Sequence, residues 1–541
     1  MTILQDMTQH QPYNAVADFV DLNVTRGLGA KVAFVDPRRS LTYEELQQAT
    51  CRFAHALRAL GLHQENRIVL LMQDSVEYPI AFWGALRAGI IPIPLNSLLT
   101  TDQYDYVFND SRAAALVISE ALLGVVEPIV GQANYLRNVI VVGDECKNKE
   151  CGSLPTHDFH SLLAQGPAAP IQAATMSDEV AFWLYSSGST GGPKGVKHIH
   201  TSLIGIARCM GQGVLEIQRD DVVFSAAKLF FAYGLGNAMA FPMSVGATTV
   251  LLPERPTPDL VFELMRKHRP TLFFAGPALY AALLLHPDIG KGAGSDRLRA
   301  CVSAGDALPA SLGERWRAVV GTDILDGIGS TEMLNTFISN RPGDVRYGTS
   351  GKPVPGYNAK IVGEDGSELG DGEAGELAVR GPSSAEGYWN QRAKSHRTFV
   401  GEWVHTGDTY IRDADGYYHY CGRIDDMFKV GGVWVSPFII EAAFLSHEAV
   451  LRTAVIGSKD NDDMVKPKAY VVLKGNREAD SALTQSIKAH VKEKLIARFS
   501  DASAHGFYAY YPRWIEFRAE LPMTATGKIQ RFKLREEDAG S

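Results

Sequence analysis

The chain has 541 residues, of which 45% are hydrophobic and 21% are charged, as in an ordinary folded globular protein. A net charge of −8 leaves no basic excess to neutralise phosphates and argues against a nucleic-acid partner. The length predicts roughly three to four units of about 150 residues. Six scattered cysteines lack a second pair at zinc spacing, so they indicate reduced thiols in place of a zinc site or disulfide framework.

The N-terminal stretch MTILQDMTQHQPYN has neither the basic start nor the apolar core of a signal peptide. The most apolar stretch near the front, AFWGALRAGIIPIPL, is interrupted by an arginine and two prolines and is too short to span a bilayer. We therefore expect a cytoplasmic protein, monomeric or homodimeric, with no membrane partner.

Short apolar runs alternate with helix-like segments over residues 1–330. Residues 75–89 and 257–268 have helical spacing. Strand–helix alternation at this pitch predicts an α/β fold with largely parallel sheets. The runs predicted as strands are 66–72, 113–119, 138–143, 179–187, 247–253, 271–276 and 300–305.

The texture changes after about residue 345, where short segments punctuated by DG and GE turns predict a small antiparallel β unit. The last ~115 residues predict a separate small α+β domain. We place the large N-terminal domain at 1–423 and the C-terminal domain at 424–541. Within the latter we expect helices at 436–447 and 481–497 and strands at 453–457, 468–473 and 514–518.

Residues 183–197, WLYSSGSTGGPKGVK, have the composition of a phosphate-binding loop. Small residues let backbone N–H groups converge on an anion, and a lysine adds a mobile charge. The stretch fails the G-x-x-x-x-G-K-[ST] pattern, because Pro193 replaces the second glycine and Gly195 follows Lys194. It lies between a predicted strand and a predicted helix at TSLIGIARCMG. The loop residues we single out are Ser186, Ser187, Gly188, Ser189, Thr190, Gly191 and Lys194.

Four further motifs contain residues suited to nucleotide chemistry. DGIGSTEM, 326–333, sets Thr331 and Glu332 beyond a strand, and a carboxylate with phosphate oxygens suits Mg²⁺. In WVHTGD, 403–408, and CGRIDDMFKVGG, 421–432, Asp408 and Arg423 could hold a ribose. LPMTATGKIQRFKLR, 521–535, carries Lys528 on a small-residue turn. Taken alone, the first three are equally readable as ordinary turns with a surface charge, and the fourth as a basic C-terminal helix.

Together the five motifs resemble the adenylate-forming superfamily of acyl-CoA synthetases, peptide-synthetase adenylation domains and luciferases. The matching stretches are YSSGSTGGPKGV, GIGSTEM, HTGD, GRIDDMFKVGG and TATGK, in the family's order and across essentially the whole chain. Four more stretches are similar to the benzoate- and hydroxybenzoate–CoA ligase branch: FSAAKLFFAYGLGNAM, YGTSGKPVPGY, VSPFIIE and KPKAYVV.

This resemblance implies ATP, Mg²⁺ and coenzyme A as reactants or cofactors and two half-reactions. A carboxylate would attack the α-phosphorus of ATP, and the CoA thiol would then displace AMP. Thr331 would touch the α-phosphate, Glu332 would hold Mg²⁺, and Lys528 would reach from the C-terminal domain. The segments that would frame adenine are 303–305 (Ser303, Ala304, Gly305) and 326–328 (Asp326, Gly327, Ile328).

The resemblance further implies that the small domain rotates between the half-reactions about a hinge at Asp425. Rotation would withdraw Lys528 and bring the loop of Lys429, Gly431 and Gly432 to the site, where glycines leave room for pantetheine. The stretch 500–514 departs from the family, because it is longer and has a tyrosine in place of the usual lysine.

The expected acyl pocket has flat aromatic walls that favour a small aromatic carboxylic acid. Asn335 and Thr336 replace the usual His and Ile of benzoate-type relatives, so two polar groups would suit a ring hydroxyl or amino substituent. The expected lining is Phe231, Ala232, Tyr233, Gly327, Asn335 and Thr336. The alternatives are an adenylating enzyme that loads a carrier protein, a medium-chain acyl-CoA synthetase and a catalytically silent ligand-binding relative.

Overall fold

The computed structural model describes residues 10–143, 151–188, 191–431, 433–475, 477, 479–498, 504–523 and 529–539. They form two compact units, the larger from 1–359 with 378–406 and the smaller from 360–377 with 407–541. The chain passes between the units at β17 (Asn358–Val362), β18 (Ala374–Arg380) and β21 (Trp403–Arg412). The division predicted at residue 423 concerns which segment moves and stays a prediction.

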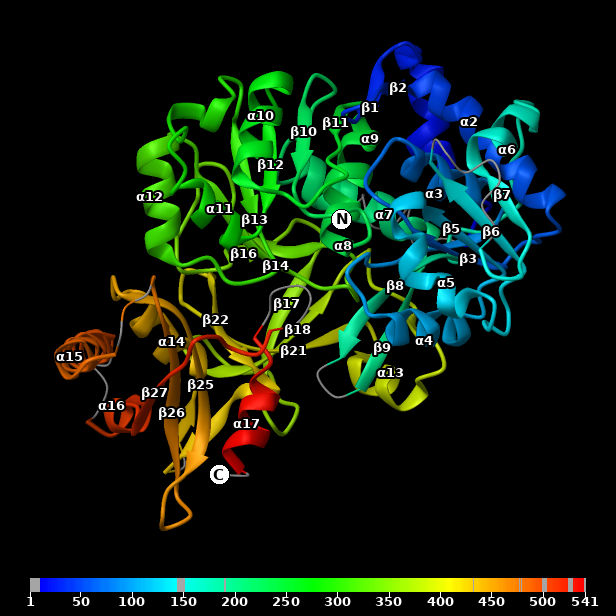
Figure 1. The fold of residues 1–541 in the computed structure, drawn as a ribbon. Helices are drawn as coiled ribbons and strands as arrows, with labels where there is room; N and C mark the ends of the chain where they lie inside the picture. The colour runs from blue at the N-terminus through cyan, green and yellow to red at the C-terminus, as the bar shows by residue number, and fades with distance from the viewer. Residues whose placement is uncertain are drawn as a thin grey trace. The chain divides into compact units, whose positions relative to one another are not determined.

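A nine-stranded sheet forms one half of the larger unit (Figure 1). Its central strands pair in parallel, while β14–β15, β15–β16 and β1–β2 pair antiparallel. The parallel-rich α/β fold expected from the alternating pattern is therefore confirmed. In spatial order the strands are β16 (Lys352–Pro353), β15 (Thr336–Ser339), β14 (Ile324–Gly329), β13 (Ala300–Ser303), β12 (Leu272–Ala275), β10 (Val222–Ser225), β11 (Thr248–Val250), β1 (Val32–Val35) and β2 (Ser40–Thr42).

Three amphipathic helices cover one face of this sheet: α10 (Pro258–His268), α11 (Pro277–Leu283) and α12 (Ala310–Val320). The α10 sequence fixes its own ends, because Thr257 caps the first turn, proline follows it, and basic residues fill the last turn. The opposite side carries five further helical segments: α7 (His200–Ile206), η5 (Ala207–Gln212), α8 (Ala232–Leu235), η6 (Gly236–Ala240) and α9 (Phe241–Val245).

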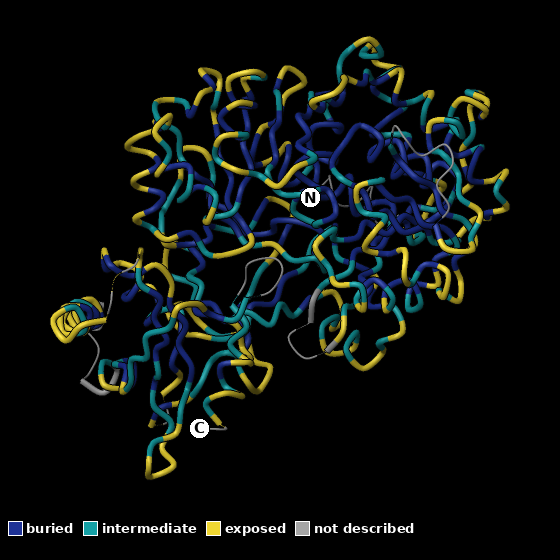
Figure 2. Tube along the Cα trace, viewed as in Figure 1, coloured by how far each residue is buried: buried dark blue, intermediate teal, exposed yellow. Residues whose placement is uncertain are grey.

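A second, all-parallel sheet has five strands in the order β4-β3-β5-β6-β7. Alternate residues of β3, β4, β5 and β6 form a core with α4 and α5, and all five residues of β5 are buried. Figure 2 shows this sheet as a buried centre inside exposed loops. The elements are β3 (Arg67–Leu71), β4 (Ile91–Pro94), β5 (Ala115–Ser119), β6 (Asn138–Val142), β7 (Thr156–Asp158), α2 (Tyr43–Ala59), α3 (Glu77–Arg87), α4 (Thr101–Ser111), α5 (Leu123–Val130) and α6 (Phe159–Gln165).

A third sheet of the larger unit is small, antiparallel and important for the site. It consists of β19 (Gly387–Tyr388), β9 (Gly191–Ile199) and β8 (Val180–Gly188). Helix α13 (Arg392–Thr398) and strand β20 (Phe399–Val400) follow β19. The remaining short helices are η1 (Ala17–Asp21), η2 (Val24–Leu28), η3 (Glu120–Leu122) and η7 (Lys291–Gly294).

The smaller unit contains the three-stranded sheet β25-β26-β27 with helices on both faces. Helices α14, α15 and α16 share a core with one face, and α17 packs on the other through Leu534. The predicted α+β pattern is confirmed; α16 was not predicted. The elements are β22 (Tyr418–Arg423), η8 (Ile424–Asp426), β23 (Phe428–Val430), β24 (Val433–Val435), α14 (Pro437–Leu445), β25 (Val450–Lys459), β26 (Val465–Leu473), α15 (Ser481–Arg498), α16 (Ala504–Tyr510), β27 (Trp514–Phe517) and α17 (Arg531–Ala539).

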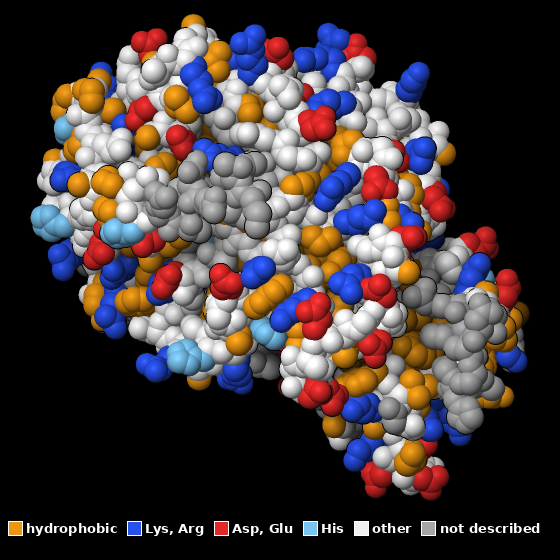
Figure 3. Space-filling view, turned by 180° about the vertical axis from the view of Figure 1, so that it is seen from behind, with side chains coloured by type: hydrophobic (Ala, Val, Ile, Leu, Met, Phe, Trp, Pro, Cys, Tyr) orange, Lys and Arg blue, Asp and Glu red, His pale blue; other side chains and the backbone are white. Residues whose placement is uncertain are grey.

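Charged side chains of both signs are interspersed over the surface seen in Figure 3, and no single-sign area spreads across its coloured residues. Among the helices that the structure describes, none combines the length and apolarity needed to cross a bilayer.

Candidate active site

The glycine-rich stretch lies between the predicted strand and the predicted helix, which are observed as β8 and as α7 with η5, but its second half forms a strand that was not predicted. Strand β9 follows the loop directly, and helix α7 starts only at His200. Residues 196–199 alternate in burial, which suits a strand and delays the helix. Ser186 lies opposite Lys194 in the register, and Ser186 Oγ is buried without a hydrogen-bond partner among the described residues.

The glycine after Lys194 has a packing reason. A Cβ at Gly195 would lie 3.3 Å from the Tyr185 ring and 3.4 Å from the Trp183 ring. Tyr185 is itself held by a 2.6 Å hydrogen bond from its hydroxyl to Asp110 Oδ2 on α4. Tyr185 thus holds the hairpin against α4, which packs on the second sheet. The same packing explains the glycine at the position where a G-x-x-x-x-G-K-[ST] loop has its Ser/Thr metal ligand.

Lys194 and Glu332, 138 positions apart in the sequence, converge in the larger unit. Lys194 Nζ lies 3.8 Å from Glu332 Oε1, and both side chains are less than one-fifth exposed. Tyr388 joins them: its hydroxyl donates to Glu332 Oε1 at 2.8 Å and accepts from Lys194 Nζ at 3.3 Å. The lysine also lies over the Tyr388 ring, 4.4 Å from the centroid. The arrangement presents a cation and a carboxylate side by side.

Strand β19 brings Tyr388 to this place. Tyr388 pairs with Val196 of β9, and Trp389 N donates to Gly195 O at 2.8 Å. Ala385 N donates to Glu332 O at 2.8 Å, which fixes the glutamate backbone beside the same strand. Sequence reasoning missed Tyr388, because no local spacing connects residues near 194, 332 and 388.

His198 holds the GIGSTEM turn through a hydrogen bond to its backbone. Its Nε2 lies 2.8 Å from Thr331 O and donates to it, while Nδ1 is buried without a partner in the described chain. Burial lowers the pKa of His198 to about 4, although the Thr331 carbonyl and Glu332 raise it in part. The imidazole is therefore neutral at physiological pH.

We expect acid to destabilise the protein through His198. Its folded pKa of about 4 lies below the unfolded value of 6.5, so the folded state loses stability as the pH falls from about 6.5 to 4. Between pH 7 and 4.5 the wild type should lose about 2 kcal/mol more of its free energy of unfolding than His198→Asn does. Urea unfolding at the two pH values measures this difference. Equal losses in the two proteins would contradict this cause. Burial also lowers the pKa of His200 to about 4, so the variant keeps part of the acid sensitivity.

Two of the predicted segments lie at the carboxyl ends of neighbouring parallel strands. Ser303 pairs with Asp326 in the β13–β14 register. The Asp326 side chain is buried, with Oδ2 3.4 Å from Leu308 N and Oδ1 unpaired among the described residues. Burial raises the pKa of Asp326 to about 8, against the lowering by the Leu308 N–H. Gly305 has φ +98°, a conformation that suits glycine. The remaining members, Ala304, Gly327 and Ile328, lie on the same two segments.

The predicted acyl-pocket residues also come together. Asn335 Nδ2 donates to Ala232 O at 3.2 Å and to Tyr233 O at 3.0 Å. A Cβ at Gly236 would lie 2.2 Å from Asn335 Nδ2, which explains the second glycine of AYGLG. Asn335 therefore holds the backbone of α8, and a hydrogen bond to a ring substituent would compete with these contacts.

Thr336 differs from Asn335, because its Oγ1 is buried and has no partner in the described part of the chain. Its methyl group faces Gly327, where an added Cβ would approach it to 2.7 Å. Phe231, also predicted, precedes α8 and contacts Phe230 with ring centroids 4.5 Å apart.

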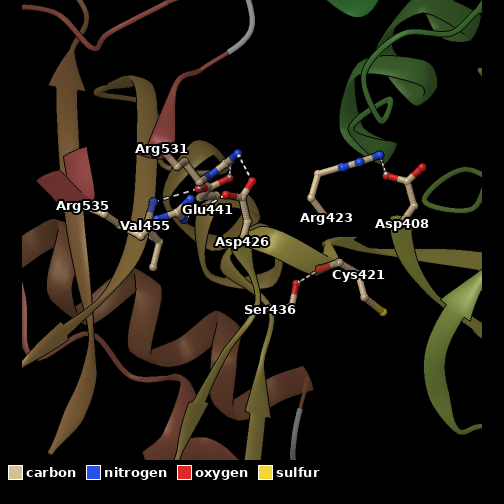
Figure 4. A network of polar contacts seen from close by, with 9 residues as sticks. All are labelled: Asp408, Cys421, Arg423, Asp426, Ser436, Glu441, Val455, Arg531 and Arg535. Carbon is tan, nitrogen blue, oxygen red and sulfur yellow. Dashed lines mark hydrogen bonds and ion pairs between the residues drawn. The ribbon is translucent and has the colours of Figure 1, made fainter. Parts of the chain in front are cut away.

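Asp408 and Arg423 face each other on adjacent strands of the smaller unit (Figure 4). Arg423 Nη1 donates to Asp408 Oδ1 at 3.0 Å. A Cβ at Gly407 would lie 2.9 Å from Arg423 Nη2, so this glycine leaves space for the guanidinium. Burial lowers the pKa of Arg423, but the Asp408 carboxylate outweighs it and keeps the pKa above the ordinary value.

The predicted hinge and pantetheine loop follow in the same unit. Asp425 lies in η8, directly after Arg423 and Ile424. Lys429 in β23 contacts the exposed Trp434 ring, and Gly431 has φ +57°. The unpredicted helix α16 braces this hairpin, since Tyr510 OH donates to Trp434 O at 3.1 Å and accepts from Ser436 N at 3.3 Å.

Some predicted residues lie outside the described chain: Ser189, Thr190, Gly432 and Lys528. Ser187, Gly188 and Gly191 are described only as strand backbone. The described residues hold no cluster of three His, Cys, Asp or Glu side chains that could bind a metal by itself. A single carboxylate such as Glu332 fits an ion like Mg²⁺ that retains water and phosphate oxygens as its other ligands.

Comparison with known proteins places this geometry in a family. The 4-hydroxybenzoate–CoA/benzoate–CoA ligase of Rhodopseudomonas palustris is 52% identical over 98% of this chain and 95% of its own. The benzoate–CoA ligase of Thauera aromatica is 49% identical over 97% and 96%. A solved benzoate CoA ligase from Burkholderia xenovorans LB400 superposes with a TM-score of 0.85 at 45% identity, covering 97% of this chain and 100% of that one.

The family descriptions follow the two parts of the chain. The AMP-binding enzyme model matches residues 23–389, and the AMP-binding enzyme C-terminal domain model matches residues 439–528. The matches together span most of the chain, and the expected superfamily is confirmed. The protein belongs to the AMP-binding enzyme family.

Proposed function

We propose that this protein is an ATP-dependent ligase that joins a small aromatic carboxylate to coenzyme A. The observation that carries the proposal is the Lys194–Tyr388–Glu332 cluster beside the glycine-rich hairpin. The substrate class rests on the relatives named above, whose names specify benzoate and 4-hydroxybenzoate.

In the first half-reaction a carboxylate oxygen attacks the α-phosphorus of ATP, and the bond to the β-phosphate breaks to release pyrophosphate. Two anions must meet, so the site must offset their charge. Lys194 Nζ binds the departing phosphates with backbone N–H groups of the hairpin, and Ser186 Oγ has a free hydrogen bond to offer. Thr331 lies beside Glu332 to contact the α-phosphate. Mg²⁺, held by Glu332, would supply further positive charge on the phosphate oxygens.

Each unit has its own candidate groups for adenosine. The buried Oδ1 of Asp326 lacks a donor in the described chain, and an adenine amino group supplies one. Segments 303–305 and 326–328 provide the walls around it. In the smaller unit, Asp408 accepts from the ribose hydroxyls, and Arg423 fixes its orientation.

In the second half-reaction the deprotonated CoA thiol attacks the acyl carbon, and the bond to AMP breaks. We propose that the small domain turns about Asp425 before this step. The turn withdraws Lys528, whose charge serves adenylation alone, and places Lys429, Gly431 and Gly432 at the thiol entry.

Thr336 is the group best suited to meet a ring hydroxyl. A buried hydroxyl without a partner costs free energy that a hydrogen bond from the substrate removes. The enzyme therefore accepts hydroxybenzoate as well as benzoate.

Tyr388→Phe is expected to lower the rate of adenylation about 10- to 100-fold. The variant removes one hydrogen bond to the Glu332 carboxylate, a type of interaction worth about 1.5–3 kcal/mol. Pyrophosphate release at saturating substrate measures the rate, and the Tyr185→Phe variant, which loses a hydroxyl bonded to Asp110 instead, provides the comparison. An unchanged rate in Tyr388→Phe would show that the Tyr388 hydroxyl takes no part in adenylation.

The proposed function is tested by pyrophosphate release across benzoate, its hydroxy and amino derivatives, and hexanoate, with and without CoA. We expect the highest kcat/KM for benzoate or a hydroxybenzoate, with an aroyl-CoA product. A preference for hexanoate would overturn the aromatic substrate class. Release of pyrophosphate without any thioester would favour loading of a carrier protein.

A further inference from the structure

Arg531 lies at the centre of a polar network in the smaller unit (Figure 4). It opens helix α17 and follows Lys528 by three positions. Its guanidinium forks onto Glu441 of α14: Nη2 donates to Oε2 at 2.7 Å, and Nε donates to Oε1 at 3.1 Å. Planar two-point contact of this kind fixes direction as well as distance.

The same guanidinium reaches the predicted hinge segment. Arg531 Nη1 donates to Asp426 Oδ2 at 3.2 Å, and Arg535, one helical turn further, donates to Asp426 Oδ1 at 3.0 Å. Asp426 directly follows Asp425 in η8. One arginine therefore connects the start of α17 to the residue beside the hinge.

Glu441 is built into the fold as the fixed end of this network. It is only 5% exposed, and its Oε1 also accepts from Val455 N of β25 at 2.8 Å. A buried carboxylate is costly without its partners, so the Arg531 contact is retained wherever the unit is folded. Fixed on Glu441, the arginine holds the first turn of α17 against α14 and β25.

The segment preceding Arg531 is closed at its described ends. Met523 and Ile529 form an isolated antiparallel bridge, and Gln530 N donates to Pro522 O at 2.8 Å. The chain before and after residues 524–528 is thus joined directly beside Arg531. The contact between this part of the chain and the hinge segment comes from Arg531.

We propose that Arg531, through Glu441 and Asp426, is a positioning residue for adenylation that couples the base of the Lys528 segment to the hinge segment. The inference rests on the proposed function, in which Lys528 acts in the first half-reaction alone. The hinge motion then moves the start of α17 together with Asp426. Loss of the Arg531 contacts frees the start of α17, three positions after Lys528, and slows adenylation, while thioester formation continues.

The test measures the two half-reactions separately in the full chain. Adenylation is followed as pyrophosphate release from benzoate and ATP, and thioester formation as benzoyl-CoA made from supplied benzoyl-adenylate. We expect Arg531→Met to slow adenylation about 100-fold and Arg531→Lys, which keeps charge but not the fork, about 10-fold. Both variants should make thioester within about threefold of the wild type.

Asp538→Asn is the matched control, because Asp538 anchors the far end of the same helix through a 2.8 Å contact with Lys468. It should change the melting temperature but leave the ratio of the two half-reaction rates as in the wild type. Glu441→Gln provides a second variant should Arg531→Met fail to fold, and it should reproduce the adenylation defect through loss of the charged acceptor.

Equal loss of both half-reactions in folded Arg531→Lys or Glu441→Gln would overturn the inference and leave Arg531 a purely structural residue. Unchanged adenylation in these variants would overturn it as well. The proposed function is judged separately by the wild type: if that protein forms no benzoyl-adenylate, the function fails before Arg531 is tested.

Discussion

Glu332→Gln is expected to lower the rate of aroyl-adenylate formation about 100- to 1000-fold, the range typical for removing one charge-stabilising group from an active site. The substitution keeps the shape and the hydrogen bond from Tyr388 but removes the charge that faces Lys194 and that would hold Mg²⁺. The Mg²⁺ concentration needed for half-maximal rate should rise at the same time. Pyrophosphate release over a Mg²⁺ titration measures both effects.

Glu386→Gln is the control for this experiment. Glu386 is an exposed carboxylate two residues before Tyr388, and its backbone N–H bonds to Lys197 O at 2.8 Å. It should leave the rate and the Mg²⁺ dependence unchanged. A Glu332→Gln enzyme with the wild-type Mg²⁺ dependence would show that the metal is held elsewhere.

Lys528→Ala is expected to lower adenylation by a similar factor, about 100- to 1000-fold, while sparing thioester formation from supplied aroyl-adenylate. Lysine acts here as a point charge on the carboxylate and α-phosphate, with no proton to transfer, and the proposed domain rotation removes it before the thiol attacks. Comparison of the two half-reactions in one preparation measures the split.

Lys533→Ala, at an exposed position on α17, is the control for loss of a lysine in the same segment. It should leave both half-reactions at the wild-type rate. Adenylation at the normal rate in Lys528→Ala would assign the role to another residue, and equal loss in both half-reactions would argue against rotation about Asp425.

Local patterns predicted most of the fold. The buried strand at 66–72 and the capped helix at 257–268 are observed as β3 and α10, because their periodicity and end residues depend on neighbours within one turn or pleat. The helix after the glycine-rich loop is observed at its predicted place, but the strand between them was not predicted. There β9 is stabilised by pairing with β8 and β19, and β19 lies about 190 residues later in the chain.

The site was predicted where a motif names the residue and missed where only the fold brings it in. Lys194 and Glu332 each belong to a recognisable stretch, and the structure brings them to 3.8 Å. Tyr388 and His198 belong to no such stretch; strand pairing and burial give them their contacts. Asn335 shows the converse, since its polarity suggested the substrate but its amide bonds the backbone of α8.

The central claim is that one chain forms an enzyme-bound aroyl-adenylate and then transfers the acyl group to CoA. The most direct test mixes the enzyme with benzoate, ATP and Mg²⁺ without CoA, quenches one sample, and adds CoA to the rest. We expect benzoyl-AMP and pyrophosphate in equal amounts in the first sample, then conversion to benzoyl-CoA and AMP. Formation of ADP and phosphate, or an adenylate that CoA does not consume, would contradict it.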